Sequence, residues 1–289
     1  MPADMPTEVD HSVTNYVDDS SNSVGAKSLE EIRKYTECYM EVVERYYEAN
    51  RLKLNMEKTT IMIVGNQEKK ESLKLKLGKH TVTNDLSIKI LGWWISPDLK
   101  LNHHISKIKG PIYRTLAEIK PYVKFMSLKL RREIVYSKAV SIINYGLALY
   151  SGQCEEIKDR MTTIIMKANR LIYNQPILDK TKNEWLCKKI GVKTPRQLMA
   201  EAAAKAMHSV INTQQPPEIF KLLVFPKHFR KAAQVGLKSY PRTKKCRRSI
   251  FYRALMQFND LPEELRYCHP KMFKRMVRKR RIREVPDPQ

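Results

Sequence analysis

The sequence predicts an α+β protein, with a small antiparallel sheet and a packed helix first and a mostly helical region after them. Strand-like alternation of apolar and polar residues occurs before residue 100, and apolar residues at helical spacing dominate from Leu101 onward. Only 9 glycines in 289 residues argue against a turn-rich all-β fold. With 42% hydrophobic residues, a chain of this length can bury one substantial core or two modest ones.

The first predicted element surrounds the run Asn15-Tyr16-Val17-Asp18-Asp19. Alternating residues precede this run, and small polar residues up to Gly25 follow it. This pattern predicts a strand, a turn that carries two acids, and a return strand. Adjacent carboxylates repel each other unless a divalent cation such as Mg²⁺ neutralises them, so the run indicates a metal site. The alternative is an ordinary solvated turn.

Four further segments are assigned before residue 100. Ser28 and Glu31 match a capping box, which predicts a helix that runs to about Asn50. Its apolar stripe should pack on the sheet and consists of Ile32, Tyr35, Cys38, Tyr39, Val42, Val43 and Tyr46. We expect a short strand at 61–64, a charged hairpin or loop at 67–79, and one continuous strand at 88–96.

Four helices are predicted beyond residue 100. They span 101–120, with a break near Gly110-Pro111, and then 127–150, 155–173 and 195–212. In the second helix the residues expected to face inward are Leu128, Leu130, Ile134, Val135, Ala139, Ile142 and Ile143. In the third they are Met161, Ile164, Ile165, Ala168 and Leu171.

The charge of the chain indicates a polyanionic partner. The net charge is +24, and it is unevenly spread, with −7 over residues 1–50 and +31 over the remainder. RNA or DNA is the natural partner of such a protein, and an anionic membrane is a weaker alternative. Two basic runs suit sequence-independent contact with phosphates. Their cations are Arg242, Lys244, Lys245, Arg247 and Arg248 in the first run, and Lys274, Arg275, Arg278, Lys279, Arg280, Arg281 and Arg283 in the second. The second run also fits a nuclear import signal, and the alternative for both is a solvated basic surface.

Cysteine usage and hydropathy bear on the cellular setting. The five cysteines are scattered without C-x-x-C spacing, so neither a zinc site nor a disulfide partner is expected. The longest apolar stretch, residues 140–150, is too short to span a membrane. The N-terminus has neither the basic start nor the apolar core of a signal peptide. We therefore expect an intracellular protein of the nucleus, the cytoplasm or both.

Three motifs occur in a compatible order and spacing. They are Tyr16-Val17-Asp18-Asp19, then Leu52-x-Leu54-Asn55-x-x-Lys58-Thr59, then the stretch from Ile90-Leu91-Gly92 to His104-Ile105. Together they resemble the second half of the palm, and the start of the thumb, of non-LTR (LINE-like) retrotransposon reverse transcriptases. A weaker likeness extends to Asn259-Asp260-Leu261-Pro262. The resemblance implies a partial palm at 1–100, a helical thumb-like region at 101–215 and a basic C-terminal region at 216–289.

The resemblance also implies a chemistry. The family is an RNA-directed DNA polymerase, in which two Mg²⁺ ions promote attack of a primer 3′-OH on a nucleotide. Asp18 and Asp19 correspond to two metal ligands, and Lys58 to the group that protonates the departing pyrophosphate. Tyr16 and Trp93 are candidate nucleic-acid contacts. The implied partners are an RNA template, a DNA primer or target, and deoxynucleotides, with no membrane partner.

A third metal-binding aspartate, expected well upstream of the hairpin in this family, has no counterpart among the 17 residues before Asp18. Asp10 would lie roughly 26 Å from Asp18 along an extended strand, too far to share a metal ion. We therefore predict a palm-to-thumb fragment that binds nucleic acid but does not extend a primer by itself. The alternative is a non-catalytic RNA- or DNA-binding helical protein derived from a retroelement.

Overall fold

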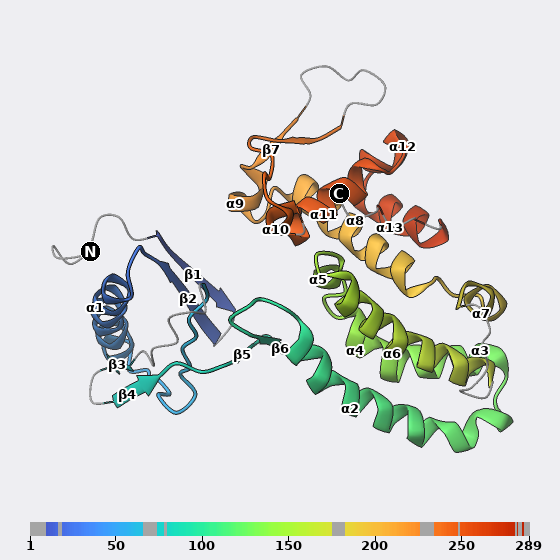
Figure 1. The fold of residues 1–289 in the computed structure, drawn as a ribbon, viewed down its shortest axis with the longest axis horizontal. Helices are drawn as coiled ribbons and strands as arrows, with labels where there is room; N and C mark the ends of the chain where they lie inside the picture. The colour runs from blue at the N-terminus through green and yellow to red at the C-terminus, as the bar shows by residue number, and fades with distance from the viewer. Residues whose placement is uncertain are drawn as a thin grey trace. The chain divides into compact units, whose positions relative to one another are not determined.

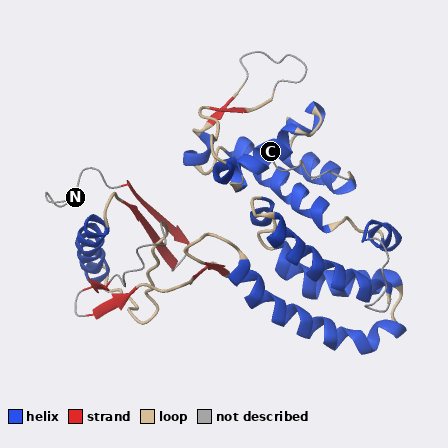
Figure 2. Ribbon diagram, in the orientation of Figure 1, coloured by secondary structure: helices blue, strands red, loops and turns tan. Residues whose placement is uncertain are grey.

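The chain divides into two compact units, residues 1–100 and residues 101–289. The computed structural model describes residues 10–16, 19–65, 74–77, 80–174, 183–225, 234–247, 249–280, 282 and 285. Both strands and helices are present, so the coarse prediction of a mixed α+β protein is confirmed (Figures 1 and 2). The division into palm-like, thumb-like and basic C-terminal regions stays a prediction.

The first unit contains one long helix and three antiparallel strand pairs. Its elements are β1 (Asp10–Tyr16), β2 (Asp19–Gly25), α1 (Leu29–Ala49), β3 (Lys74–Leu77), β4 (His80–Thr83), β5 (Ile88–Ile90) and β6 (Trp93–Ile95). The pairs are β1–β2, β3–β4 and β5–β6.

The second unit is mainly helical. Its helices are α2 (Asn102–Ile119), the 3₁₀ helix η1 (Lys120–Phe125), α3 (Leu128–Val135), the π-helical turn η2 (Tyr136–Val140), α4 (Ser141–Asn144), α5 (Ala148–Ser151), α6 (Glu155–Tyr173), α7 (Asn183–Ile190), α8 (Pro195–Thr213), α9 (Pro217–Phe220), α10 (Lys244–Arg247), α11 (Ile250–Asn259), α12 (Glu263–Arg266) and α13 (Pro270–Lys279). Its strands are β7 (Leu223–Val224) and β8 (Gly236–Leu237), which pair with each other.

Helix α1 begins and ends close to where the sequence predicts. The Ser28 hydroxyl accepts a hydrogen bond from the Glu31 amide at 3.2 Å, and the Glu31 carboxylate accepts one from the Ser28 amide at 3.1 Å. This capping box satisfies two amides that have no partner within the helix. Of the predicted stripe only Tyr35 is fully buried, whereas Tyr46 remains 62% exposed. The helix therefore packs on part of its apolar face.

The strands of the first unit do not form the single sheet that the sequence predicts. Among the described residues of this unit each sheet has two strands, and Ile61 makes only an isolated parallel bridge to Asn84. Leu75 on β3 is the buried centre of the local core, 1% exposed. The side chains packed against it are Met40, Met56, Ile61, Ile63 and Val82. The apolar residues of the 54–64 segment thus serve side-chain packing rather than strand pairing.

The predicted strand at 88–96 is wrong, because a tight turn divides it. β5 and β6 pair antiparallel, with Ile90 opposite Trp93. The two turn residues, Leu91 and Gly92, have φ angles of +46° and +85°. Two successive left-handed residues form the type of turn that matches the twist of paired strands. Glycine adopts such a φ at no steric cost, and this freedom reverses the chain.

Helix α8 lies at the centre of the second unit, because alanines on its sides let its neighbours approach closely. Ala203 and Met207 pack with Leu255 and Phe258 of α11 in one buried cluster. Another buried cluster joins α8 to α12, α13 and the residues around them, and it comprises Ala200, Ala204, Leu261, Leu265, Phe273, Val277 and Ile282. The α11 and α13 segments, which follow residue 215, therefore share their cores with α8.

Three helix predictions in this unit need correction. The helix expected at 127–150 is interrupted, first by the π-helical turn η2 and then at Gly146, whose φ of +67° ends the helical run. Leu128 and Leu130, expected to face inward, are 42% and 44% exposed. The expected break near Pro111 does not occur, since α2 continues through this proline. The helices predicted at 155–173 and 195–212 agree closely with α6 and α8.

Within the described part of the chain, no helix is both long enough and apolar enough to cross a membrane. All five cysteines lie in the described part of the chain, and none of them is in a disulfide.

Candidate functional site

The hairpin predicted around the two aspartates is present. β1 and β2 pair antiparallel, and Tyr16 lies opposite Asp19 in the last register position before the turn. The side chain of Asp19 is exposed, and Tyr16 is 61% exposed. Asp18 and Val17, which complete the predicted motif, lie outside the described residues. The hairpin thus presents Tyr16 and Asp19 to solvent beside its tip.

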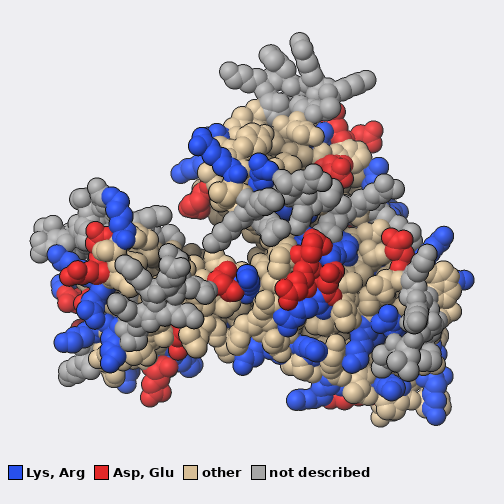
Figure 3. Space-filling model, viewed as in Figure 1, with Lys and Arg blue, Asp and Glu red and all other residues tan. Residues whose placement is uncertain are grey.

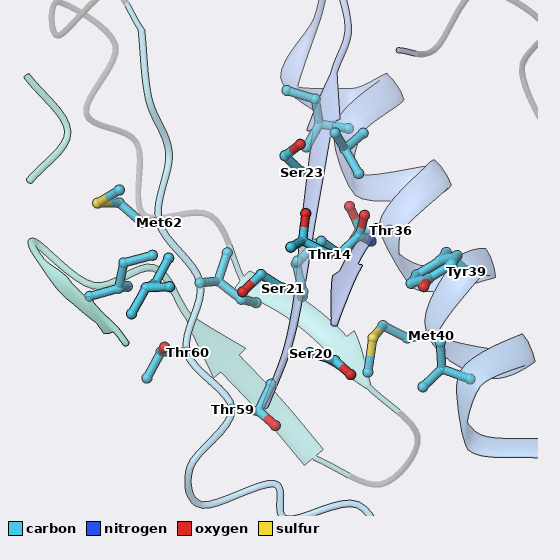
Figure 4. A pocket seen from close by; sticks show the side chains of 18 of the residues that line it. Thr14, Ser20, Ser21, Ser23, Thr36, Tyr39, Met40, Thr59, Thr60 and Met62 are labelled. Atoms are coloured by element: carbon cyan, nitrogen blue, oxygen red, sulfur yellow. The ribbon is translucent and has the colours of Figure 1, made fainter. Parts of the chain in front are cut away.

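A groove of about 830 Å³ lies beside this hairpin (Figure 4). Its walls are α1, the two hairpin strands, the 54–64 segment and residues of β5 and β6. Apolar side chains such as Val43, Ile61 and Ile90 contribute to the lining, and the hydroxyls of Thr14, Ser20 and Ser21 line it from the hairpin. The groove therefore combines apolar side chains from several elements with hydroxyls along the hairpin.

The second predicted motif meets the hairpin at this groove. Ser20 follows Asp19 in the chain, Thr59 follows Lys58, and both Ser20 and Thr59 line the groove. Figure 4 shows both side chains among those that line the groove. Tertiary packing thus brings within one groove two motifs that are well separated in the sequence.

Lys58 is held by a local turn that Asn55 organises. The Lys58 amide donates to the Asn55 carbonyl at 3.2 Å and to its Oδ1 at 3.3 Å, and the Thr59 hydroxyl donates to the same carbonyl at 3.0 Å. Asparagine favours such turns because its side chain mimics a backbone acceptor. The turn leaves the Lys58 side chain exposed.

The described residues provide too few ligands for the pair of Mg²⁺ ions that the family resemblance implies. Carboxylate oxygens are suitable ligands for Mg²⁺, which accepts six oxygens in an octahedral arrangement. Asp19 is one such ligand, but nowhere in the described ranges do three or more His, Cys, Asp or Glu side chains gather as a metal site would require. A two-ion site would therefore need Asp18 and further carboxylates from beyond the described ranges or from another chain.

The structure does not support Trp93 as a nucleic-acid contact. Its side chain is 8% exposed at the start of β6, so it is a core residue. The neighbouring Trp94 is half-buried and lies opposite Lys89, whose Nζ is 6.0 Å from the centre of the indole. Alternation along a strand allowed either tryptophan to be the buried one, and packing selects Trp93.

The basic residues of α13 occupy one solvent-facing surface. Phe273 and Val277 are 1% and 0% exposed, and they anchor the helix in the core of the second unit. The exposed cations on α13 and at its end are Lys271, Lys274, Arg275, Arg278, Lys279 and Arg280. No acid occurs in α13. We call these six side chains the α13 basic face, and its density of positive charge suits contact with a phosphate backbone.

The other predicted basic run is only partly described. Arg242 is exposed, whereas Arg247 is half-buried and its Nε donates to the Pro241 carbonyl at 3.3 Å. Lys244 and Lys245 lie in α10, but their side chains are outside the described part, as are Arg248 and Arg281. Arg242 is therefore the solvent-facing cation that the structure supports in this run.

Sequence reasoning missed a third basic region, which lies on α2 and η1. Tyr113 on α2 has the Nζ atoms of Lys109 and Lys167 at 5.5 Å and 3.7 Å from the centre of its ring. Lys167 belongs to α6, so only the tertiary structure brings it to Tyr113. The residues on η1 had a detectable signal in the sequence, since Tyr122, Lys124 and Phe125 alternate aromatic and basic character.

Comparison with known proteins adds no assignment: no protein-family model, no curated protein and no solved structure matches the chain.

Proposed function

We propose that this chain is a nucleic-acid-binding portion of an RNA-directed DNA polymerase of the non-LTR retrotransposon type. In this proposal the second unit binds the phosphate backbones of an RNA template and a DNA primer. The β1–β2 hairpin contributes Asp18 and Asp19 to a metal site that other carboxylates complete, and Lys58 contributes a proton donor. Magnesium, when bound at such a site, would supply electrostatic stabilisation of the reacting phosphate.

The separation of charge between the two units supports the binding part of the proposal most directly. Residues 1–100 carry 14 basic and 16 acidic side chains, whereas residues 101–289 carry 40 and 14, a net charge of +26. The α13 basic face concentrates part of this charge on a helix that Phe273 and Val277 anchor in the core of the second unit. A rigid cationic surface attracts a polyanion and releases its counterions.

The meeting of the two motifs at one groove supports the polymerase part. Asp19 and Lys58 are each adjacent in sequence to a residue that lines this groove. A carboxylate that holds a metal ion and an ammonium that donates a proton are both needed for nucleotidyl transfer. The basic surface of the second unit needs no metal site, so it also fits a second candidate, a non-catalytic RNA- or DNA-binding protein that retains the hairpin without its chemistry.

Binding can be tested by titrating the full chain into a labelled RNA–DNA hybrid at several salt concentrations. The test variant replaces Lys274, Arg275, Arg278 and Lys279 with glutamine. If each contacts one phosphate, the slope of log K against log[salt] should become less steep by about 3–4. The control variant makes the same change at Lys34, Arg51, Lys53 and Lys100, all exposed in the first unit. Equal slopes of log K against log[salt] for the two variants would reject the α13 basic face as the phosphate-binding surface.

Catalysis can be tested by primer extension on an RNA template with Mg²⁺ or Mn²⁺. We expect no extension by this chain alone, and extension once a segment or partner supplies the missing carboxylates. A variant with Asp18→Asn and Asp19→Asn should abolish any extension. Extension by the unmodified chain that is lost in this variant would show that the chain completes its own site. Extension that survives in the variant would reject the role of the hairpin.

A further inference from the structure

The 3₁₀ helix η1 exposes two aromatic rings to solvent. Phe125 is 78% exposed and Tyr122 is 60% exposed. The next most exposed phenylalanine in the described part of the chain is Phe225, at 38%. A large ring left in water forgoes the free energy of burial, so a pair of such rings on one short helix indicates a surface kept for a partner.

The geometry of a 3₁₀ helix places both rings on the same side. With three residues per turn, side chains at i and i+3 lie one above the other, separated by roughly 6 Å along the axis. Tyr122 and Phe125 have this spacing and form one column. The adjacent column contains Lys124, and the third contains Val123, which is 1% exposed and faces the core.

Three features hold η1 in place. Val123 anchors it in the core, and Pro121 fixes its backbone near the first turn. Just beyond its end, Arg131 donates from Nε to the Met126 carbonyl at 2.9 Å and from a terminal nitrogen to the Ile172 carbonyl at 3.5 Å, which ties η1 to α3 and α6. The rings are thus presented by a preorganised segment rather than by a loose loop, which lowers the entropic cost of binding.

The segment that carries the two rings is strongly basic. Residues 102–132 contain eight Lys or Arg side chains and one acid, Glu118. Lys120, Lys124 and Lys129 flank the rings in the sequence, and their side chains are exposed. The Lys124 Nζ is 4.9 Å from the centre of the Phe125 ring. Over the part of the second unit that contains α2, Figure 3 shows more Lys and Arg than Asp and Glu side chains. An apolar protein surface would gain nothing from this positive charge, so the charge favours an anionic partner.

We propose that η1 is a stacking platform for the unpaired bases of single-stranded nucleic acid. One base stacks on Phe125 and a neighbouring base on Tyr122, while Lys124 and Lys129 contact the phosphates. Aromatic rings bind any base by its face, and those faces are accessible only where the bases are unpaired. The platform rests on the proposed function in one respect, since it takes nucleic acid as the partner, but it does not depend on catalysis.

The test compares two labelled probes for the full chain, an oligo(dT) and an abasic oligonucleotide of the same length. Both carry the same phosphates, and only the first carries bases that can stack. We expect tighter binding to oligo(dT), and a loss of about five-fold or more in this preference in Phe125→Ala and in Tyr122→Ala. Phe125→Trp should keep the preference. Leu128→Ala, which removes an exposed apolar side chain that cannot stack, is the matched control. Circular dichroism checks that each variant is folded.

The outcomes separate this inference from the proposed function. Equal, salt-sensitive binding to both probes would overturn the platform and leave phosphate binding by the α13 basic face intact. Equal loss of duplex and oligo(dT) binding in Phe125→Ala would also overturn it, because a duplex hides its base faces. Absence of binding to either probe would overturn both proposals. A preference for oligo(dT) in a chain that fails every primer-extension assay would support the platform alone.

Discussion

Asn259 closes a two-way hydrogen-bonded link with the backbone of Val235. Its Oδ1 accepts from the Val235 amide at 3.1 Å, and its Nδ2 donates to the Val235 carbonyl at 2.8 Å. Both residues are buried, and Asn259 is the last residue of α11. The asparagine side chain thus pairs with the backbone as a strand would, and it connects α11 to the segment that enters β8.

This link predicts the effect of Asn259→Asp. The aspartate keeps an acceptor for the Val235 amide but leaves the Val235 carbonyl without its donor, in a buried position. We expect a loss of about 1–3 kcal/mol in the free energy of unfolding, measured by urea denaturation. Asn144→Asp, on an exposed residue, makes the same chemical change and should cost much less. Similar losses in the two variants would contradict the structural role of Asn259.

His208 predicts a dependence of stability on pH. Its Nε2 lies 3.1 Å from the Cys268 carbonyl, which can only accept, and its Nδ1 lies 3.2 Å from the Asn212 amide nitrogen. The neutral ring that donates from Nε2 therefore fits this site, and it stacks on Phe273 at 3.7 Å between ring centres. Burial lowers the pKa of His208 below its usual range, partly offset by the Cys268 hydrogen bond.

The direction of the pH dependence follows from the linkage between proton binding and unfolding. A histidine with a lowered folded-state pKa binds its proton more tightly in the unfolded chain, so acid favours unfolding. The contribution of His208 to the free energy of unfolding should be constant above about pH 6.5. Below that pH it should fall, by at most about 1.4 kcal/mol per pH unit for each such group. His104, whose pKa burial also lowers, acts in the same direction. Denaturation between pH 5 and 8 should therefore show a flatter profile for His208→Gln than for the unmodified chain or for His80→Gln, an exposed control.

Leu75 predicts how the first unit is stabilised. It is 1% exposed and is surrounded by apolar side chains from α1, β4 and the 54–64 segment. Leu75→Ala should cost about 2–5 kcal/mol, because it removes buried methyl groups and leaves a cavity. Leu86→Ala removes the same atoms from a side chain that is 78% exposed, and it should cost little. Thermal unfolding of the two variants provides the measurement. Equal melting temperatures would show that Leu75 on β3 does not stabilise this core.

Two glycines predict opposite responses to alanine. At Gly92 the φ of +85° is costly for any residue with a Cβ, so Gly92→Ala should destabilise the β5–β6 turn by about 1 kcal/mol. At Gly110, inside α2, an added Cβ meets nothing within 4 Å, and Gly110→Ala should stabilise by about 0.5–1 kcal/mol. Chemical denaturation distinguishes the signs. Stabilisation in both variants would mean that the turn at Leu91-Gly92 is not formed.

Local patterns in the sequence determined the elements that local forces stabilise. The capping box at Ser28 and Glu31 located the start of α1, and the helical spacing of apolar residues located α6 and α8. The alternation around Tyr16 located the β1–β2 hairpin that carries Asp19. Each of these signals depends on residues within a few positions of one another. The charge that predicts a polyanionic partner is likewise read from composition alone, because it is a sum over residues and needs no fold.

Only the tertiary structure decided which apolar residues pair, which are buried and where helices stop. The residue pattern at 88–96 is compatible with one continuous strand or with a turn at Leu91-Gly92. In the structure the chain turns there, and β5 and β6 form a hairpin. The alternation of Trp93 and Trp94 allowed either to face the core, and packing buried Trp93. The contacts of Tyr113 with Lys167, and of Asn259 with Val235, join segments distant in sequence. Such choices depend on packing free energy shared among many side chains, which no single stretch of sequence contains.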